Sequence, residues 1–316
     1  MPEHRMTRFA DVRGHDRVRG FLQSAVAEGR LAHALMFAGS DGIGKRSVAL
    51  ALAARLLCEA DGDDACGVCA SCRQAGVGSH ADLLTVVPAA GKKEIGVDRV
   101  RDLKRFMQLQ PLGGRAKVVI IDDAPTLSTA AQNALLKTLE EPPPRSFLIL
   151  IVNNADSLLS TVRSRCQRVN FSPLPTEIVV EILTANGLEA PAAIELAALA
   201  EGSPGRALRL QSCVLDGARA RLSASLADLR GARYSRLMQV AHELGHPESD
   251  LPVKLELVLA HFRDVVVEAI RTASYATADA ALRQADLVNE AWQSVRYRNP
   301  NRSLLLEALL LQLAAI

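Results

Sequence analysis

Aromatic residues, long apolar runs and an excess of one charge are all scarce in this chain of 316 residues. Phe, Trp and Tyr together make up 3% of the chain, which argues against the aromatic platforms that bind single-stranded nucleic acid by stacking. The net charge is only +2, too small to attract nucleic acid or anionic lipid to the whole surface. Any contact with DNA must therefore be local or shared with a partner.

No segment reaches the roughly 18 apolar residues that a membrane span requires, and the N-terminal residues lack the pattern of a secretory signal. The densest apolar stretch, 303–316, would form a helix of about 21 Å, shorter than a bilayer core of about 30 Å. We therefore expect a cytoplasmic protein without membrane contact, in which this stretch lies in a helix bundle or a subunit contact.

Cysteine is also scarce, but four of the six cysteines are clustered: Cys58, Cys66, Cys69 and Cys72. The spacing C-x7-C-x2-C-x2-C can bring four thiolates to one tetrahedral ion, and four sulfurs leave no open position for water. This pattern predicts a structural zinc site, whereas a disulfide framework does not suit a cytoplasmic chain. The alternative is a cluster of free thiols without metal.

The N-terminal half alternates short apolar runs with helical patterns, which is typical of a parallel sheet covered by helices. The predicted strands are 35–38, 83–87, 118–121, 147–152 and 167–171, with crossover helices at 97–110 and 130–139. Two prolines near residue 172 end this region, and the remainder predicts helices only. The sequence thus predicts three parts: an α/β domain over 1–172 with a zinc module at about 58–80, a small helical domain over 173–213, and a helical domain over 214–316.

A glycine loop follows the first predicted strand and precedes a helix, with Gly39, Gly42 and Gly44 leading to Lys45. Strand, glycine loop and helix in this order form a phosphate-binding loop, because backbone N–H groups face the phosphates and the lysine reaches the outer ones. We predict a nucleotide site here. The alternative is a glycine-rich turn without ligand.

One position departs from that pattern. Arg46 stands where a Ser or Thr would give Mg²⁺ a hydroxyl oxygen, and arginine has five donors and no acceptor. Ser47 is the nearest hydroxyl, but one residue along a helix turns a side chain by about 100°. ATP binding thus remains predicted, while Mg²⁺ binding and hydrolysis are impaired.

Polar residues follow two more predicted strands, at the sheet edge where ligands of such sheets bind. Asp122 and Asp123 suit a Walker B arrangement, with Asp122 near the metal and Asp123 near the attacking water. Asn153 and Asn154 suit a phosphate sensor. The alternatives are acids that cap the next helix and asparagines that form a turn.

Arg165 lies just before the last predicted strand, in the run Ser-Arg-Cys. An arginine at a sheet edge can complete the nucleotide site of a neighbouring subunit by neutralising charge in the transition state. A local salt bridge explains the residue equally well.

The run from His242 to His246 matches H-E-x-x-H, in which two histidines bind zinc and Glu243 would activate water. Gly245 and Pro247 weaken or end the helix that this site needs. A zinc hydrolase is therefore a remote alternative.

Together these motifs resemble the bacterial clamp-loader family of AAA+ proteins over nearly the whole chain. The resemblance rests on 9–15 (FADVRGH), on 133–143 (NALLKTLEEPP), on the Ser-Arg-Cys run around Arg165, and on the four-cysteine insertion. Two departures resemble the stator of the complex rather than its ATPase motors: Arg46, and Gly205 at the place of the motors' second sensor arginine.

The resemblance implies an AAA+ domain with a zinc module, a helical lid and a C-terminal collar. It implies a hetero-pentamer with the ATPase (gamma/tau) and delta subunits of DNA polymerase III. That complex uses ATP to open the sliding clamp and place it on primed DNA, with Arg165 serving the adjoining motor as an arginine finger. An active motor of the same complex is the main alternative.

Overall fold

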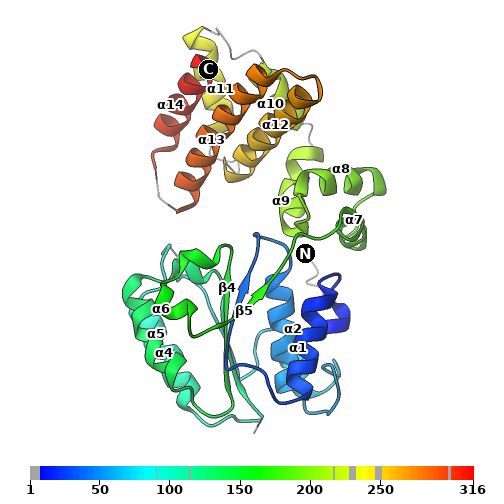
Figure 1. Ribbon diagram of the computed structural model, residues 1–316, viewed down its shortest axis with the longest axis vertical. Coiled ribbons are helices and arrows are strands. Elements are labelled where there is room, and N and C mark those ends of the chain that lie inside the picture. The colour runs from blue at the N-terminus through cyan, green and yellow to red at the C-terminus, as the bar shows by residue number, and fades with distance from the viewer. Residues whose placement is uncertain are drawn as a thin grey trace. The chain divides into compact units, whose positions relative to one another are not determined.

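The chain forms two compact units, Met1–Arg206 and Ala207–Ile316, in the computed structural model (Figure 1). The structure describes residues 8–89, 91–113, 115–215, 218–227, 233–245, 251–297 and 300–316. Each unit has its own core. The division into three domains stays a prediction.

A parallel five-stranded sheet forms the centre of the first unit, as the alternating pattern predicted. Its strand order is β2-β3-β4-β1-β5. The bounds are β1 Ala34–Ala38, β2 Leu83–Val86, β3 Lys117–Ile121, β4 Ser146–Val152 and β5 Gln167–Asn170. Each lies within about one residue of its predicted range. The inner strands β1, β3 and β4 are marked most clearly, because apolar runs followed by Gly, Asp or Asn are typical of buried parallel strands.

Helices cover both faces of this sheet, since alternate residues of each strand point to opposite sides. Leu35 and Phe37 of β1 face one core with α1 (Asp16–Ala27) and α2 (Lys45–Leu57). Met36 faces the other core with α4 (Val97–Gln108) and α5 (Thr129–Glu140). Figure 1 shows α1 and α2 on one side of the sheet and α4, α5 and α6 (Ser160–Arg163) on the other.

Short elements fill the connections of the first unit. They are the 3-10 helices η1 (Phe9–Asp11), η2 (Ala124–Thr126) and η3 (Ala155–Ser157), and helix α3 (Ala70–Gly76) in the cysteine segment. After β5 come α7 (Thr176–Ala185) and α8 (Ala190–Ala200), in the region where the sequence predicts helices only. Helix α9 (Pro204–Leu215) begins in the first unit and continues into the second.

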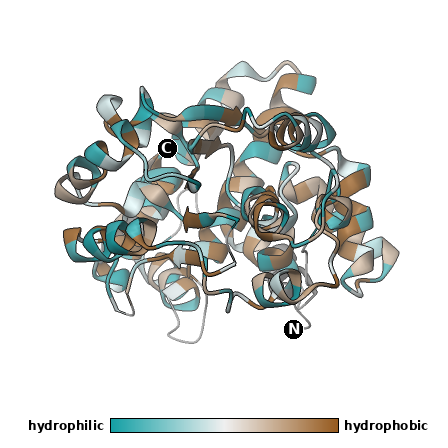
Figure 2. Cartoon of the chain, turned by 90° about the horizontal axis from the view of Figure 1, so that it is seen from below, coloured by the Kyte–Doolittle hydropathy of each residue, from teal (hydrophilic) through white to brown (hydrophobic). Residues whose placement is uncertain are grey.

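The second unit is helical in the part that the structure describes, in agreement with its Ala/Leu-rich pattern. Its helices are α10 Ala218–Ala227, α11 Tyr234–Gly245, α12 Leu251–Arg271, α13 Tyr275–Tyr297 and α14 Arg302–Ala315. Figure 2 shows brown apolar and teal polar residues side by side along the helices of the chain, as expected where one face of a helix packs into a core. Of the helices described, none is long and apolar enough to cross a membrane.

A buried ion pair joins the start of the neighbouring strands β2 and β3, since Asp82 directly precedes β2 and Lys117 is the first residue of β3. Lys117 Nζ lies 2.9 Å from Asp82 Oδ1, and their side chains are 4% and 1% exposed. Asp82 also accepts hydrogen bonds from the backbone N–H groups of Leu112 and Gly113, at 3.0 and 2.9 Å. Burial alone would raise the pKa of Asp82, but the bonds from Gly113, Lys117 and Leu112 outweigh it and lower that pKa.

Candidate functional site

The glycine loop lies between β1 and α2, as predicted. Gly42 and Gly44 have φ values of 73° and 104°, in the region that glycine adopts without a steric penalty. Gly44 is the N-cap of α2, so the first N–H groups of a 13-residue helix face the space above the sheet edge. The backbone therefore has the form that a phosphate-binding loop requires.

Lys45, the first residue of α2, is 4% exposed and folds back onto the loop. Its Nζ donates to the carbonyl oxygens of Gly39 and Ser40, both at 2.6 Å, and to Asn153 Oδ1 at 3.1 Å. The loop carbonyls thus hold the ammonium group beside the position that phosphate would take. The predicted residues Gly39, Lys45 and Asn153 meet because β1 and β4 are neighbours and end together at Ala38 and Val152.

Arg46 follows Lys45 and is directed at the end of β3. Its Nη1 lies 3.4 Å from Asp122 Oδ2, with Arg46 62% and Asp122 23% exposed. A guanidinium group has no lone pair for a metal, and its positive charge here lies against the carboxylate that would complete a magnesium shell. The residues present therefore do not fit Mg²⁺. Ser47 is half-buried on the same turn of α2.

In the polar pairs that follow β3 and β4, the two members of each pair make different contacts. Asp123 adopts a left-handed backbone conformation with φ 59° as N-cap of η2, with no side-chain cap hydrogen bond. Asn154 Oδ1 accepts from Asp156 N at 3.0 Å and caps η3, which is the turn-forming alternative. Asn153 alone of its pair bonds to Lys45.

The start of α9 packs directly on the glycine loop. Ser203 Oγ donates to the carbonyl oxygen of Asp41 at 2.7 Å, and Gly205 N donates to that of Gly42 at 2.9 Å. A Cβ atom added to Gly205 would lie 2.8 Å from Gly42 Cα, so no side chain fits at this position. The neighbouring Arg206 bonds instead to Glu201, with Nη1 2.7 Å from Oε2. Glycine at 205 thus permits the close approach of this segment to the loop.

His15 also contacts the loop, through Nε2 at 2.6 Å from the carbonyl oxygen of Ile43. Burial lowers the pKa of His15, which favours the neutral ring that donates from Nε2. This contact brings the segment before α1 to the glycine loop. The sequence motif that contains His15 did not reveal it.

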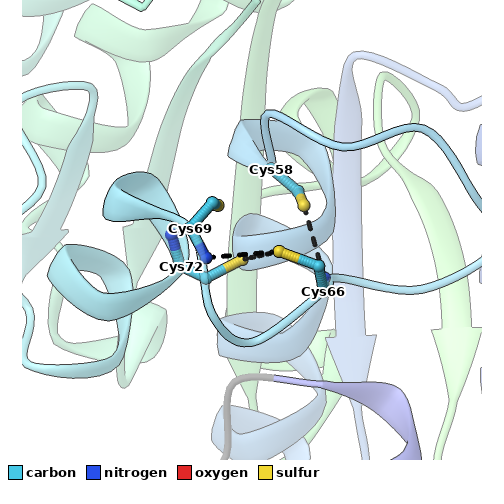
Figure 3. A group of neighbouring side chains, drawn as sticks. All are labelled: Cys58, Cys66, Cys69 and Cys72. Atoms are coloured by element: carbon cyan, nitrogen blue, oxygen red, sulfur yellow. Dashed lines mark hydrogen bonds between the residues drawn. The ribbon is translucent and has the colours of Figure 1, made fainter.

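The four clustered cysteines meet as the spacing predicted (Figure 3). Their sulfur atoms all lie within 4.8 Å of one another, and Cys66 Sγ is 3.9 Å from Cys72 Sγ. Four sulfurs at about 2.3 Å from a tetrahedral ion are about 3.8 Å apart, so the group fits zinc. In the part of the chain that the structure describes, this is the one such group of His, Cys, Asp or Glu able to hold a metal.

Backbone N–H groups support these thiols. Cys66 N donates to Cys58 Sγ, Cys69 N to Cys66 Sγ and Cys72 N to Cys69 Sγ, each at 3.3 Å. Bonds from the backbone of Val68 and of Cys69 lower the pKa of Cys66 to about 6. Such N–H···S contacts stabilise thiolates, the form that binds metal.

Arg165 lies between α6 and β5 with its side chain 37% exposed. Its Nη2 and Nε lie 2.6 and 2.9 Å from Glu140 Oε1, at the end of α5. Its Nη1 donates to the carbonyl oxygen of Thr161 at 3.0 Å and to Ser164 Oγ at 3.2 Å. The local salt bridge is thus present, and it holds the guanidinium group at the surface. The sequence had not paired Glu140 with Arg165.

The H-E-x-x-H run has little support as a site. His242 and Glu243 are exposed on the last turn of α11, which ends at Gly245. His246 lies outside the described residues.

Comparisons with known proteins point in one direction. A sequence model of the family described as "DNA polymerase III, delta subunit" matches residues 14–175, which include the glycine loop, the four cysteines and Arg165.

Two relatives illustrate the range of similarity. The chain is 37% identical over 226 residues to DNA polymerase III subunit delta' of Escherichia coli, covering 70% of this chain and 68% of that protein. It is 37% identical over 177 residues to DNA polymerase III subunit tau of Bacillus subtilis, covering 56% of this chain but only 31% of that protein.

A solved structure supports the fold. The crystal structure of a DNA polymerase III gamma subunit-related protein from Thermotoga maritima superposes with a TM-score of 0.50. The alignment covers 94% of this chain and 98% of that one, at 18% sequence identity. At that identity the likeness concerns the fold alone.

Proposed function

This chain belongs to the DNA polymerase III delta-prime family, and we propose that it is the stator of the bacterial clamp loader. In this role it assembles with the ATPase (gamma/tau) and delta subunits into a hetero-pentamer at the cytoplasmic replisome. The complex uses ATP to open the sliding clamp and to place it on primed DNA. The similarity to both delta' and tau proteins supports membership of such an assembly.

The observation that carries the proposal is the surface position of Arg165. Its guanidinium group lies at the end of the sheet beside edge strand β5, where a neighbouring subunit can reach it. An arginine supplied in trans stabilises the charge that develops on the transferred phosphoryl group. We assign Arg165 as the arginine finger for ATP bound by the adjoining motor.

The chain's own glycine loop supports the stator rather than the motor. Arg46 occupies the place of the metal-binding hydroxyl and lies against Asp122. Gly205 leaves no room for a sensor arginine. A site without the metal-binding hydroxyl and without this arginine lacks two of the groups that stabilise phosphoryl transfer.

The active motor is the second candidate, and one observation favours it. Lys45 and Asn153 are joined at 3.1 Å, as a nucleotide-sensing pair would be. A motor would hydrolyse ATP in isolation, and its activity would disappear in Lys45→Ala. The stator has no such activity of its own.

Two further parts of the chain have structural roles in this proposal. Cys58, Cys66, Cys69 and Cys72 hold one zinc ion that organises the segment between α2 and β2. The C-terminal helices form the collar that joins the subunits, and Leu304 and Leu311 of α14 are 64% and 44% exposed. Exposed leucines on a helix of an oligomeric protein are suited to contacts between subunits.

The test is the ATPase and clamp-loading activity of the reconstituted complex with primed DNA, in which only this chain is varied. Arg165→Ala should lower both activities while the pentamer still assembles. Arg168→Ala is the matched control, since Arg168 is also exposed at this edge and bonds to Asn170 of its own strand. Equal activity of Arg165→Ala and wild type would exclude the finger role.

A further inference from the structure

Arg46 is the residue at which this chain departs most clearly from a nucleotide-binding loop, and its side chain adds a positive charge to that loop. Magnesium at a phosphate-binding loop is held by a hydroxyl from the start of the helix and by a carboxylate at the end of a neighbouring strand. Here Arg46 stands at the first of these places and extends to the second, with Nη1 3.4 Å from Asp122 Oδ2. A permanent cation thus lies at the locus where the metal would bind.

A guanidinium group binds phosphate through N–H donors, whereas a metal ion binds it by coordination. A guanidinium group stays protonated and cannot ligate Mg²⁺, but its planar N–H groups bind phosphate oxygens well. Arg46 is 62% exposed, so its guanidinium group has room to turn from Asp122 toward a bound phosphate. A magnesium ion in the same place would be repelled by this charge.

The remaining phosphate-binding parts of the loop are in place. Gly42 and Gly44 give the loop its curvature, and Lys45 lies within it with its ammonium group on Gly39, Ser40 and Asn153. Ser203 and Gly205 donate to two carbonyl oxygens of the loop. Because the N–H of a peptide unit points opposite to its carbonyl, the N–H groups of these two units point away from α9. Within the loop itself, the departure is therefore confined to the metal ligand.

We propose that Arg46 replaces Mg²⁺ at this site, so that the chain binds the polyphosphate of ATP as the metal-free anion. The guanidinium group neutralises charge that magnesium neutralises elsewhere. Binding without metal-assisted hydrolysis gives a stable nucleotide complex rather than a turnover cycle. This inference concerns the chain's own loop and does not depend on Arg165.

The experiment measures ATP binding to the full-length chain alone by titration calorimetry, once with excess Mg²⁺ and once with EDTA. For wild type we expect the two dissociation constants to agree within about twofold. Arg46→Thr restores the hydroxyl, and its affinity should fall about tenfold or more when Mg²⁺ is removed, since charge-assisted bonds to phosphate are lost. Lys45→Ala should bind weakly in both buffers.

A second variant covers the case in which Arg46→Thr does not fold. Asp122→Asn releases the guanidinium group from its carboxylate partner, so this variant should bind ATP at least as tightly as wild type in both buffers. In a metal-dependent site it would bind more weakly with Mg²⁺.

Three results would overturn the proposal. They are a wild-type affinity that falls about tenfold in EDTA, metal-independent binding by Arg46→Thr, and no ATP binding by wild type in either buffer. None of these results affects the finger role, because that role is tested by Arg165 in the assembled complex.

Discussion

The buried pair of Asp82 and Lys117 gives the sharpest prediction about stability. Asp82→Asn keeps the size of the side chain but leaves the Lys117 ammonium group, 4% exposed, without its counter-charge. Removing one partner of such a pair costs about 3–5 kcal/mol of unfolding free energy. For a unit of about 200 residues, this corresponds to a melting temperature lowered by roughly 6–20 °C.

Thermal unfolding followed by circular dichroism measures this change. Asp98→Asn is the matched control, because Asp98 is 92% exposed in its pair with Arg101 and should change the melting temperature little. The double variant Asp82→Leu with Lys117→Met removes both charges and should recover part of the loss. If Asp82→Asn and Asp98→Asn lowered the melting temperature equally, the reasoning would be refuted.

The same pair makes stability depend on pH. The pKa of Asp82 is lower in the folded chain than its value of about 3.9 in the unfolded chain. Its contribution is therefore complete above that value and is lost as the pH falls through the lower folded pKa. Wild type should lose stability in this acid range more steeply than Asp82→Asn.

Two further predictions concern zinc and the loop. The purified chain should contain one zinc ion, measured by atomic emission, and Cys66→Ser should lose most of it; full zinc content in that variant would exclude the four-sulfur site. Gly205→Ala should lower the melting temperature by several degrees, because its Cβ would lie 2.8 Å from Gly42 Cα, whereas Gly96→Ala meets no atom within 4 Å; equal effects of the two would contradict the close packing.

The sequence predicts the sheet well because the three inner strands β1, β3 and β4 contain continuous apolar runs followed by Gly, Asp or Asn. Those ends also bring Gly39, Asp122 and Asn153 to one edge, since the carboxyl ends of parallel strands lie at the same edge of a sheet. The cysteine group follows from short spacing within one loop. In each of these cases a local pattern contains the information.

The contacts that could not be predicted join residues far apart in the chain. Gly205 on Gly42, His15 on Ile43 and Glu140 on Arg165 depend on how helices pack over the sheet, and side-chain periodicity does not specify this. The ion pair of Arg46 with Asp122 also joins residues far apart in the chain. The sequence shows that Arg46 departs from the loop pattern, but only the structure shows that its side chain lies against Asp122.

The central claim is that this chain acts on a neighbour's nucleotide site rather than through turnover at its own. The most direct test compares two variants of this chain, Lys45→Ala and Arg165→Ala, in the reconstituted loader with clamp and primed DNA. At the site that it serves, an arginine finger is worth about 10³-fold or more in turnover. We predict that Arg165→Ala lowers ATPase activity and clamp loading, whereas Lys45→Ala leaves ATPase turnover near wild type. Loss of turnover in Lys45→Ala with full activity in Arg165→Ala would contradict the account and identify the chain as a motor.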